Sequence, residues 1–158
     1  MKDEGLVIPA LSDGVLPEGV HRCTIEEVDA TFGRFQRSDR RIRLTESLRR
    51  FVEDVRRADV VAAVVINGSY VTAKAEPNDI DVVLALRPEV DLSQELRPFE
   101  YNIQSKRMVR KLYGFDVRVA LDGSELYQKH LGFFSQVRPD DPEQSTKRTH
   151  KGLLRIEL

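Results

Sequence analysis

One unbroken apolar segment near the middle of the chain constrains the fold more than any other feature. Residues 60–66 read Val-Val-Ala-Ala-Val-Val-Ile, and Asn67-Gly68-Ser69 ends the run. The run is far too short to cross a bilayer, which takes about 20 apolar residues. A short segment of this kind, rich in β-branched residues, is typical of a strand that is buried on both faces of a sheet.

Helices and further strands are predicted on either side of this run. Thr24 and Glu27 form a capping-box pattern, which predicts a short helix to about Phe32. From a candidate N-cap at Ser38, one helix face is predicted by apolar residues at helical spacing, at positions 44, 48, 51, 52 and 55. Two later helices are predicted over residues 93–113, with a break or start near Pro98, and over 124–134. Further strands are predicted over residues 79–86 and 115–121, with 152–158 as a candidate last strand.

Together these elements predict an α/β (α+β) fold, in which a small mixed sheet has helices packed against it. The predicted order is α-α-β-β-α-β-α with the candidate final strand. A length of 158 residues fits one domain of ordinary size, so residues 1–158 are interpreted as a single unit. Residues 1–22 are expected to be an extended lead-in without regular structure, and residues 138–151 a polar loop.

Charge and cysteine content argue against several classes of protein. The formal net charge is −1, so no overall field would draw the chain to nucleic acid or to a membrane. Residues 34–57 contain nine arginines and no lysine, which we interpret as the solvated outer face of a helix. Cys23 is the only cysteine, which excludes an internal disulfide and favours a reducing compartment. The acidic start of the chain is unlike a signal peptide, so we expect a cytoplasmic protein that does not enter a membrane.

Three aspartates lie at positions that would suit a metal site. Asp79 and Asp81 are two residues apart at the start of a predicted strand, so both side chains should point to the same face. Neighbouring carboxylates repel each other unless a cation lies between them or one is protonated. Asp116 is the second residue of the third predicted strand and would join them if the two strands pair. Three carboxylates could then hold two Mg²⁺ ions, which prefer oxygen ligands and support phosphoryl transfer.

The end of the apolar strand is a candidate phosphate site. Gly68 lets the backbone approach a phosphate closely, and Ser69 can donate a hydrogen bond from its hydroxyl. A helix that starts at about Tyr70 would add free N–H groups. Lys74 is the nearest cation in the sequence, although a solvated loop lysine explains it equally well. The first aspartate has a plainer explanation too, because residues 77–79 read Pro-Asn-Asp, a common turn sequence.

Two of these segments carry a resemblance to a known superfamily. Residues 65–70, Val-Ile-Asn-Gly-Ser-Tyr, and 78–84, Asn-Asp-Ile-Asp-Val-Val-Leu, resemble the signature of the DNA polymerase β-like nucleotidyltransferases. This resemblance covers about residues 60–121. More narrowly, the chain resembles a small bacterial family of minimal-nucleotidyltransferase-like domains, through residues 16–21, Leu-Pro-Glu-Gly-Val-His, and 151–156, Lys-Gly-Leu-Leu-Arg-Ile.

The resemblance implies a palm-like catalytic core and a role for each site residue. Gly68 and Ser69 would bind the triphosphate of an NTP, while Asp79 and Asp81 would hold both Mg²⁺ (or Mn²⁺) ions. Asp116 would bind the catalytic metal and help to deprotonate an acceptor hydroxyl. The acceptor in such small systems is a partner protein, a tRNA end or a small molecule. The same analogy implies a role in a toxin–antitoxin or defence system.

The sequence departs from the superfamily in two respects, and other functions stay open. Many small relatives have an arginine shortly after Gly-Ser, where residues 70–72 are Tyr-Val-Thr. The chain also has no room for the helical domain that binds the base and the acceptor in larger members. A non-catalytic nucleotide- and metal-binding module, or an antitoxin, would use the same pocket. RNA binding by the arginine-rich helix is disfavoured, because no aromatic stacking platform accompanies its basic residues.

Other charged and histidine residues have plain explanations. The basic residues between 106 and 111 are interpreted as a helix surface, and those between 147 and 151 as a flexible loop that could fold over a nucleotide. His130 lies among apolar neighbours on a predicted helix and is expected in the core. The three histidines lack the spacing of a zinc site.

Overall fold

A computed structural model describes residues 8–34, 38–137 and 149–158. At its centre is a mixed sheet of five strands in the order β1-β5-β2-β3-β4. The strands are β1 (Val20–Cys23), β2 (Val61–Asn67), β3 (Asp81–Leu86), β4 (Asp116–Leu121) and β5 (Leu153–Glu157). β1 is parallel to β5 and β3 is parallel to β4, whereas β2 is antiparallel to both of its neighbours.

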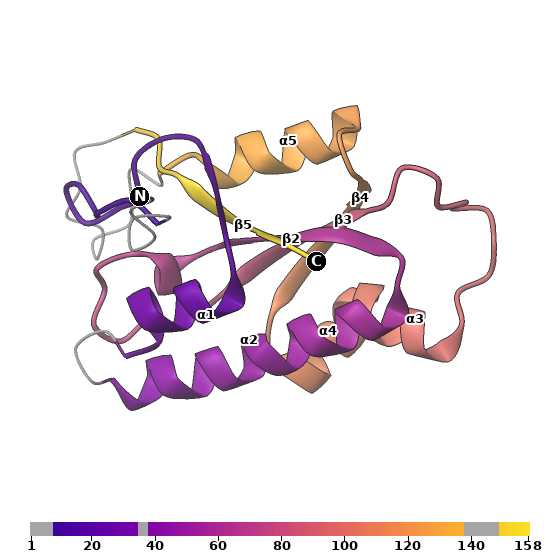
Figure 1. The fold of residues 1–158 in the computed structure, drawn as a ribbon, viewed down its shortest axis with the longest axis horizontal. Coiled ribbons are helices and arrows are strands. Elements are labelled where there is room, and N and C mark those ends of the chain that lie inside the picture. The colour runs from indigo at the N-terminus through magenta and orange to yellow at the C-terminus, as the bar shows by residue number, and fades with distance from the viewer. Residues whose placement is uncertain (1–7, 35–37, 138–148) are drawn as a thin grey trace, which may run out of the picture.

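Helices cover both faces of this sheet (Figure 1). α5 (Glu125–Phe134) lies on one face, while α2 (Asp39–Ala58), α3 (Pro98–Gln104) and α4 (Lys106–Tyr113) lie on the other. α1 (Ile25–Val28) continues into the π-helical turn η2 (Asp29–Gly33), and the 3₁₀ turn η4 (Ser69–Val71) follows β2. The predicted fold class, a small mixed sheet with helices packed against it, is confirmed.

β2 is buried on both faces, as its unbroken apolar sequence predicts. Val64 and Ile66 belong to the larger core on the α2 side, while Ala63 and Val65 belong to the smaller core on the α5 side. The predicted apolar face of α2 packs on the sheet, with full burial of Leu48, Phe51, Val52 and Val55. The alternation of β2 therefore assigns each of its side chains to one of the two cores.

All five strands meet at one end of the sheet. β2 ends there, and the strand directions make β1, β3, β4 and β5 begin there. We call this the Gly68 end of the sheet, because Gly68 directly follows β2. Residues 87–97 form a long connection at the opposite end (Figure 1).

Two segments differ from their predictions. Residues 1–22 include the start of β1 at Val20, and β1 escaped prediction because its strand partner among the described residues is β5, at the far end of the chain. The helix predicted over residues 93–113 starts at Pro98, one of the two positions allowed for there, and it is further divided into α3 and α4. Pro98 occupies the first turn of α3, where its missing N–H is no loss. Ser105 ends α3 and caps α4 by accepting a hydrogen bond from the backbone N–H of Met108 (3.3 Å).

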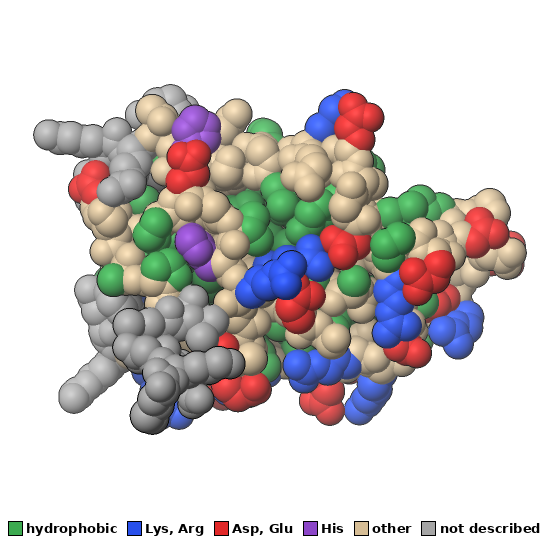
Figure 2. Space-filling model, turned by 45° about the horizontal axis from the view of Figure 1, so that its top comes forward, with side chains coloured by type: hydrophobic (Ala, Val, Ile, Leu, Met, Phe, Trp, Pro, Cys, Tyr) green, Lys and Arg blue, Asp and Glu red, His purple; other side chains and the backbone are tan. Residues whose placement is uncertain are grey.

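None of the helices in the described ranges is long and apolar enough to pass through a membrane. Acidic and basic side chains are interspersed over the described part of the face in Figure 2, with apolar side chains between them. This mixed surface agrees with the small net charge of −1.

Candidate functional site

Asn67, Asp81 and Asp116 form a row across three neighbouring strands at the Gly68 end. The strand register pairs Asn67 with Asp81 and Asp81 with Asp116. Paired residues point to the same face of a sheet, and adjacent strands lie about 4.8 Å apart. The row lies on the α5 face, because Val65, Val83 and Ala120 of the same strand faces belong to the α5-side core. The predicted proximity of Asp81 and Asp116 therefore agrees with the strand register.

Asn67 completes this row with an unsatisfied acceptor. Its side chain is 5% exposed, and its Oδ1 has no hydrogen-bond partner among the described residues. Leaving a buried acceptor unpaired costs about 1–3 kcal/mol, so it invites a ligand or a cation. From the sequence, Asn67 was expected only to end the strand, together with Gly68 and Ser69. Its position two residues after Val65, on the same strand face, was the signal that could have identified it.

Only glycine fits at the corner where β2 ends. Gly68 has a φ of 101°, which side-chain-bearing residues rarely adopt. A Cβ at this position would lie 2.9 Å from the carbonyl oxygen of Asp79 and 3.2 Å from the amide nitrogen of Asp81. The corner therefore brings the end of β2 against the start of β3 with no space for a side chain.

Asp79 is turned toward Ser69. Asp79 Oδ1 accepts hydrogen bonds from the Ser69 amide (3.0 Å) and the Ser69 hydroxyl (2.8 Å). Ser69 Oγ in turn accepts a hydrogen bond from the Asn78 amide (3.0 Å). The Ser69 hydroxyl, which was predicted to bind a phosphate, thus binds a carboxylate here together with the Ser69 amide. β3 begins at Asp81, so the alternation argument for Asp79 does not apply, and the helix expected from Tyr70 is the single 3₁₀ turn η4.

The oxygen ligands at this end of the sheet suit a divalent cation such as Mg²⁺, which binds carboxylate and carbonyl oxygens. The structure brings Asp81 and Asp116 together, adds the unpaired Oδ1 of Asn67, and directs Asp79 to the neighbouring corner. Within residues 8–34, 38–137 and 149–158, no group of three or more His, Cys, Asp or Glu side chains is arranged to hold a metal ion.

The loop after the corner is braced by a buried arginine. Arg41 of α2 is fully buried, and its guanidinium donates to four backbone carbonyls, those of Phe32 (3.2 Å), Tyr70 (2.6 Å), Thr72 (2.7 Å) and Lys74 (2.5 Å). Burial lowers the pKa of Arg41, and the nearby Tyr70 and Glu76 raise it. The interpretation of the α2 arginines as solvated is therefore wrong for Arg41. Its spacing from residues 44 and 48 places it on the inner helix face, so helical periodicity could have identified it as buried.

The two terminal segments also meet at the Gly68 end. The Gly152 amide donates to the Leu16 carbonyl (3.0 Å), and His21 Nε2 donates to the Pro17 carbonyl (2.7 Å). A Cβ on Gly152 would lie 2.0 Å from the Pro17 oxygen, so the contact requires glycine. Lys151 is buried next to this contact, whereas the predicted basic-loop residues 147 and 148 lie outside the described residues.

A family model matches residues 9–157, which include every strand and every site residue described above. The chain belongs to the DUF6932 family. The family is described as one of unknown function. No curated protein and no solved structure matches the chain. Because the DUF6932 match spans both terminal segments, the contact between Gly152 and Pro17 lies inside the family unit.

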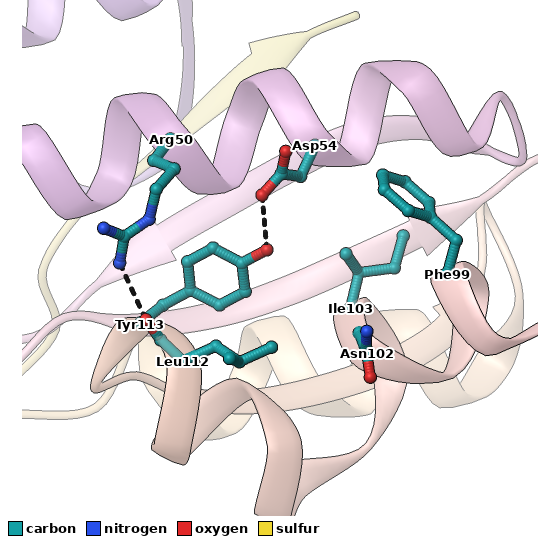
Figure 3. Close-up of a pocket in the computed structure, with 7 residues that line it drawn as sticks. All are labelled: Arg50, Asp54, Phe99, Asn102, Ile103, Leu112 and Tyr113. Carbon is teal, nitrogen blue, oxygen red and sulfur yellow. Dashed lines mark hydrogen bonds between the residues drawn. The ribbon is translucent and has the colours of Figure 1, made fainter.

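A cavity of about 370 Å³ lies on the opposite face of this DUF6932 chain, between α2, α3 and α4 (Figure 3). Its polar walls pair with one another. The Tyr113 hydroxyl donates to Asp54 Oδ2 (2.6 Å), and Arg50 donates to the Leu112 carbonyl (2.7 Å). Phe99 and Ile103 supply apolar walls. We interpret this cavity as a packing crevice between helices, remote from the row of oxygen ligands.

Proposed function

We propose that this DUF6932 chain is a metal-dependent nucleotidyltransferase, in which an acceptor hydroxyl attacks the α-phosphate of an NTP, takes the nucleoside monophosphate and releases pyrophosphate. The observation that carries this proposal is the register at the Gly68 end. Asp81 and Asp116 occupy paired positions of two parallel strands, beside a corner where only glycine fits. Carboxylates that can share cations, next to a backbone that can approach a phosphate, are what metal-assisted phosphoryl transfer requires.

Each residue has a separate task in this proposal. The Ser69 amide and hydroxyl donate to the triphosphate, and Gly68, which has no side chain, lets the backbone at the corner approach it. Asp81 and Asp116 hold Mg²⁺ or Mn²⁺, and Asp116 also accepts the proton of the acceptor hydroxyl. When bound, the cations neutralise the charge that develops on the transferred phosphoryl group. Lys74 is retained as the candidate cation for the phosphates, on the loop that Arg41 braces.

Asp79 has two positions in the proposed cycle. Without nucleotide its carboxylate accepts both Ser69 donors, as the structure has it. A phosphate oxygen bound at Ser69 would take those donors and would release Asp79 toward the cations. A carboxylate oxygen is a reasonable stand-in for a phosphate oxygen, because both accept short charge-assisted hydrogen bonds. The contact between Asp79 and Ser69 thus supports the corner as an anion site.

The acceptor is proposed by analogy with the superfamily as a partner protein, a tRNA end or a small molecule, within a toxin–antitoxin or defence system. The cytoplasm is the proposed compartment, because the NTP pool is found there.

A non-catalytic nucleotide- and metal-binding or antitoxin module is the second candidate. One observation favours it, since the hydrogen bonds of Asp79 to Ser69 also satisfy the turn without any ligand. In that case the aspartate would stabilise the corner and would have no role in transfer.

The test is label transfer from an α-³²P-labelled NTP with Mg²⁺ or Mn²⁺, in the presence of cell lysate and total RNA. Asp81→Asn and Asp116→Asn should abolish labelling and leave the melting temperature within a few degrees of wild type. Glu53→Gln is the matched control, because this exposed carboxylate lies on α2, across the sheet from the row. Wild-type labelling in both aspartate variants would contradict the proposal. A wild-type protein that binds NTP and labels nothing would favour the non-catalytic module.

A further inference from the structure

Arg118 is a charged residue that the proposed chemistry leaves without a task. It lies on β4 two residues after Asp116, so both side chains point to the α5 face of the sheet. β4 is an edge strand, whereas Gly68 and Ser69 follow β2, two strands away. Two strand spacings amount to about 10 Å, so Arg118 is clearly separated from the phosphate corner.

The guanidinium of Arg118 lies against two aromatic rings and has no acceptor among the described residues. Its Cζ lies 5.4 Å from the ring centroids of both Phe133 and Phe134. Its Nε is buried without a hydrogen-bond partner, and the side chain makes no hydrogen bond or ion pair with any described residue. A buried N–H without an acceptor costs free energy, and the other N–H groups of the guanidinium can donate to a ligand.

Another arginine of the same sheet face shows the contrast. Arg155 of β5 donates to both carboxylate oxygens of Asp122 (2.9 and 3.0 Å) and to the Tyr127 hydroxyl (2.7 Å). The protein thus satisfies Arg155 with its own groups, whereas Arg118 lies against two rings and no described residue supplies it with an anion. Its guanidinium is therefore a candidate binding group for an anionic ligand.

The surroundings of Arg118 suit a nucleotide. Phe133 is 55% exposed, so its ring is available at the surface beside the guanidinium. Burial lowers the pKa of His130, and the positive charges of Arg118 and Lys106 lower it further, which shows that basic groups gather here. Along β4 the neighbouring acid is Asp116, at the Gly68 end. The fold therefore places an exposed aromatic ring beside basic residues that are distant from it in the sequence.

We propose that Arg118 and Phe133 form a subsite for a nucleoside phosphate, in which the guanidinium binds the phosphate and the exposed ring stacks on the base. An arginine fork matches phosphate oxygens in a bidentate way, and an exposed aromatic ring accepts any base. The nucleotide is either free or the end of a single strand. We assign this subsite to the acceptor because Arg118 lies farther from the phosphate corner than Asp116 does. That assignment rests on the proposed function.

The test measures binding alone, so it does not depend on turnover. Fluorescence anisotropy is recorded with a labelled single-stranded RNA of about six nucleotides, within the usual site size, and with a fluorescent ATP analogue. The proteins are wild type, Arg118→Met and Phe133→Ala. Arg43→Met and Leu126→Ala are the controls, because Arg43 is exposed on α2 and Leu126 is exposed elsewhere on α5.

We expect each subsite variant to weaken binding of one of the two ligands about tenfold or more, with wild-type binding in both controls. Loss confined to the RNA identifies a strand end, and loss confined to the ATP analogue identifies the free nucleotide. The melting temperature of Arg118→Met should equal or exceed that of wild type, because the variant removes an unpaired buried donor.

The subsite is refuted if both variants bind both ligands as wild type does, or if wild type binds neither. A large fall in the melting temperature of Arg118→Met, with unchanged binding in Phe133→Ala, would also overturn it, because the arginine would then serve packing. Failure of label transfer alone would count against the proposed function and would leave this binding result unchanged.

Discussion

Replacing Arg41 with methionine tests the brace on the loop after Gly68. Methionine keeps much of the apolar stem of the side chain and removes every donor. The variant removes a donor from four backbone carbonyls, those of Phe32, Tyr70, Thr72 and Lys74. The Phe32 carbonyl also accepts a hydrogen bond from the backbone N–H of Arg34, so three carbonyls are stranded.

The expected loss follows from the number of stranded carbonyls. An unsatisfied buried acceptor costs about 1–3 kcal/mol. We use the low end, because water can enter the space that the guanidinium leaves. Three carbonyls at about 1 kcal/mol each give about 3 kcal/mol, a large part of the 5–15 kcal/mol by which such domains are stable. At about 2–4 °C per kcal/mol for a chain of this size, the melting temperature should fall by about 6–12 °C.

Urea denaturation followed by far-UV circular dichroism measures this change. Arg43→Met is the matched control, because Arg43 is exposed two residues away on the same helix, and its free energy of unfolding should change by less than about 0.5 kcal/mol. A loss below about 1 kcal/mol in Arg41→Met, or equal losses in both variants, would refute the reasoning.

Two further predictions concern the terminal contact and the acid response. Gly152→Ala should cost at least about 2 kcal/mol in urea denaturation, because its Cβ would lie 2.0 Å from the Pro17 oxygen. A Cβ on Gly132 of α5 would meet open space, so Gly132→Ala should instead raise the free energy of unfolding by about 0.5–1 kcal/mol. Equal changes in the free energy of unfolding of Gly152→Ala and Gly132→Ala would contradict this prediction. The hydrogen bond from Arg155 lowers the pKa of Asp122, so this carboxylate stabilises the fold above its unfolded pKa of about 4 and loses that contribution as the pH falls through its folded pKa. Urea midpoints of Asp122→Asn should therefore be lower near neutral pH and fall less steeply below about pH 4; parallel curves would argue against the ion pair.

Much of the site is readable from local sequence patterns. The apolar run ending at Asn67 and the strands starting near Asp81 and Asp116 each have a clear period, so their existence follows from residues close in sequence. The pairing of Asp81 with Asp116 was conditional on strand order, which depends on long-range packing. β1 was missed for the same reason, since its strand partner among the described residues is the distant β5.

The remaining features depend on which face a side chain occupies. Arg41 lies among several arginines, and only the phase of α2 against the sheet separates it from Arg40 and Arg43. Arg118 alternates with Val117 and Val119, and its contact with Phe133 requires the packing of α5 on β4. Asp79 precedes the strand, so its direction is fixed by the hydrogen bonds to Ser69, which strand periodicity does not describe.

Titration with Mn²⁺, followed by electron paramagnetic resonance with and without ATP, examines the row of oxygen ligands directly. Wild type should bind Mn²⁺ more tightly when ATP is present. Asp81→Asn and Asp116→Asn should each weaken Mn²⁺ binding at least about tenfold, and Glu53→Gln should not change it. Mn²⁺ affinities in both aspartate variants equal to that of wild type would contradict the claim that these two paired carboxylates hold the cation.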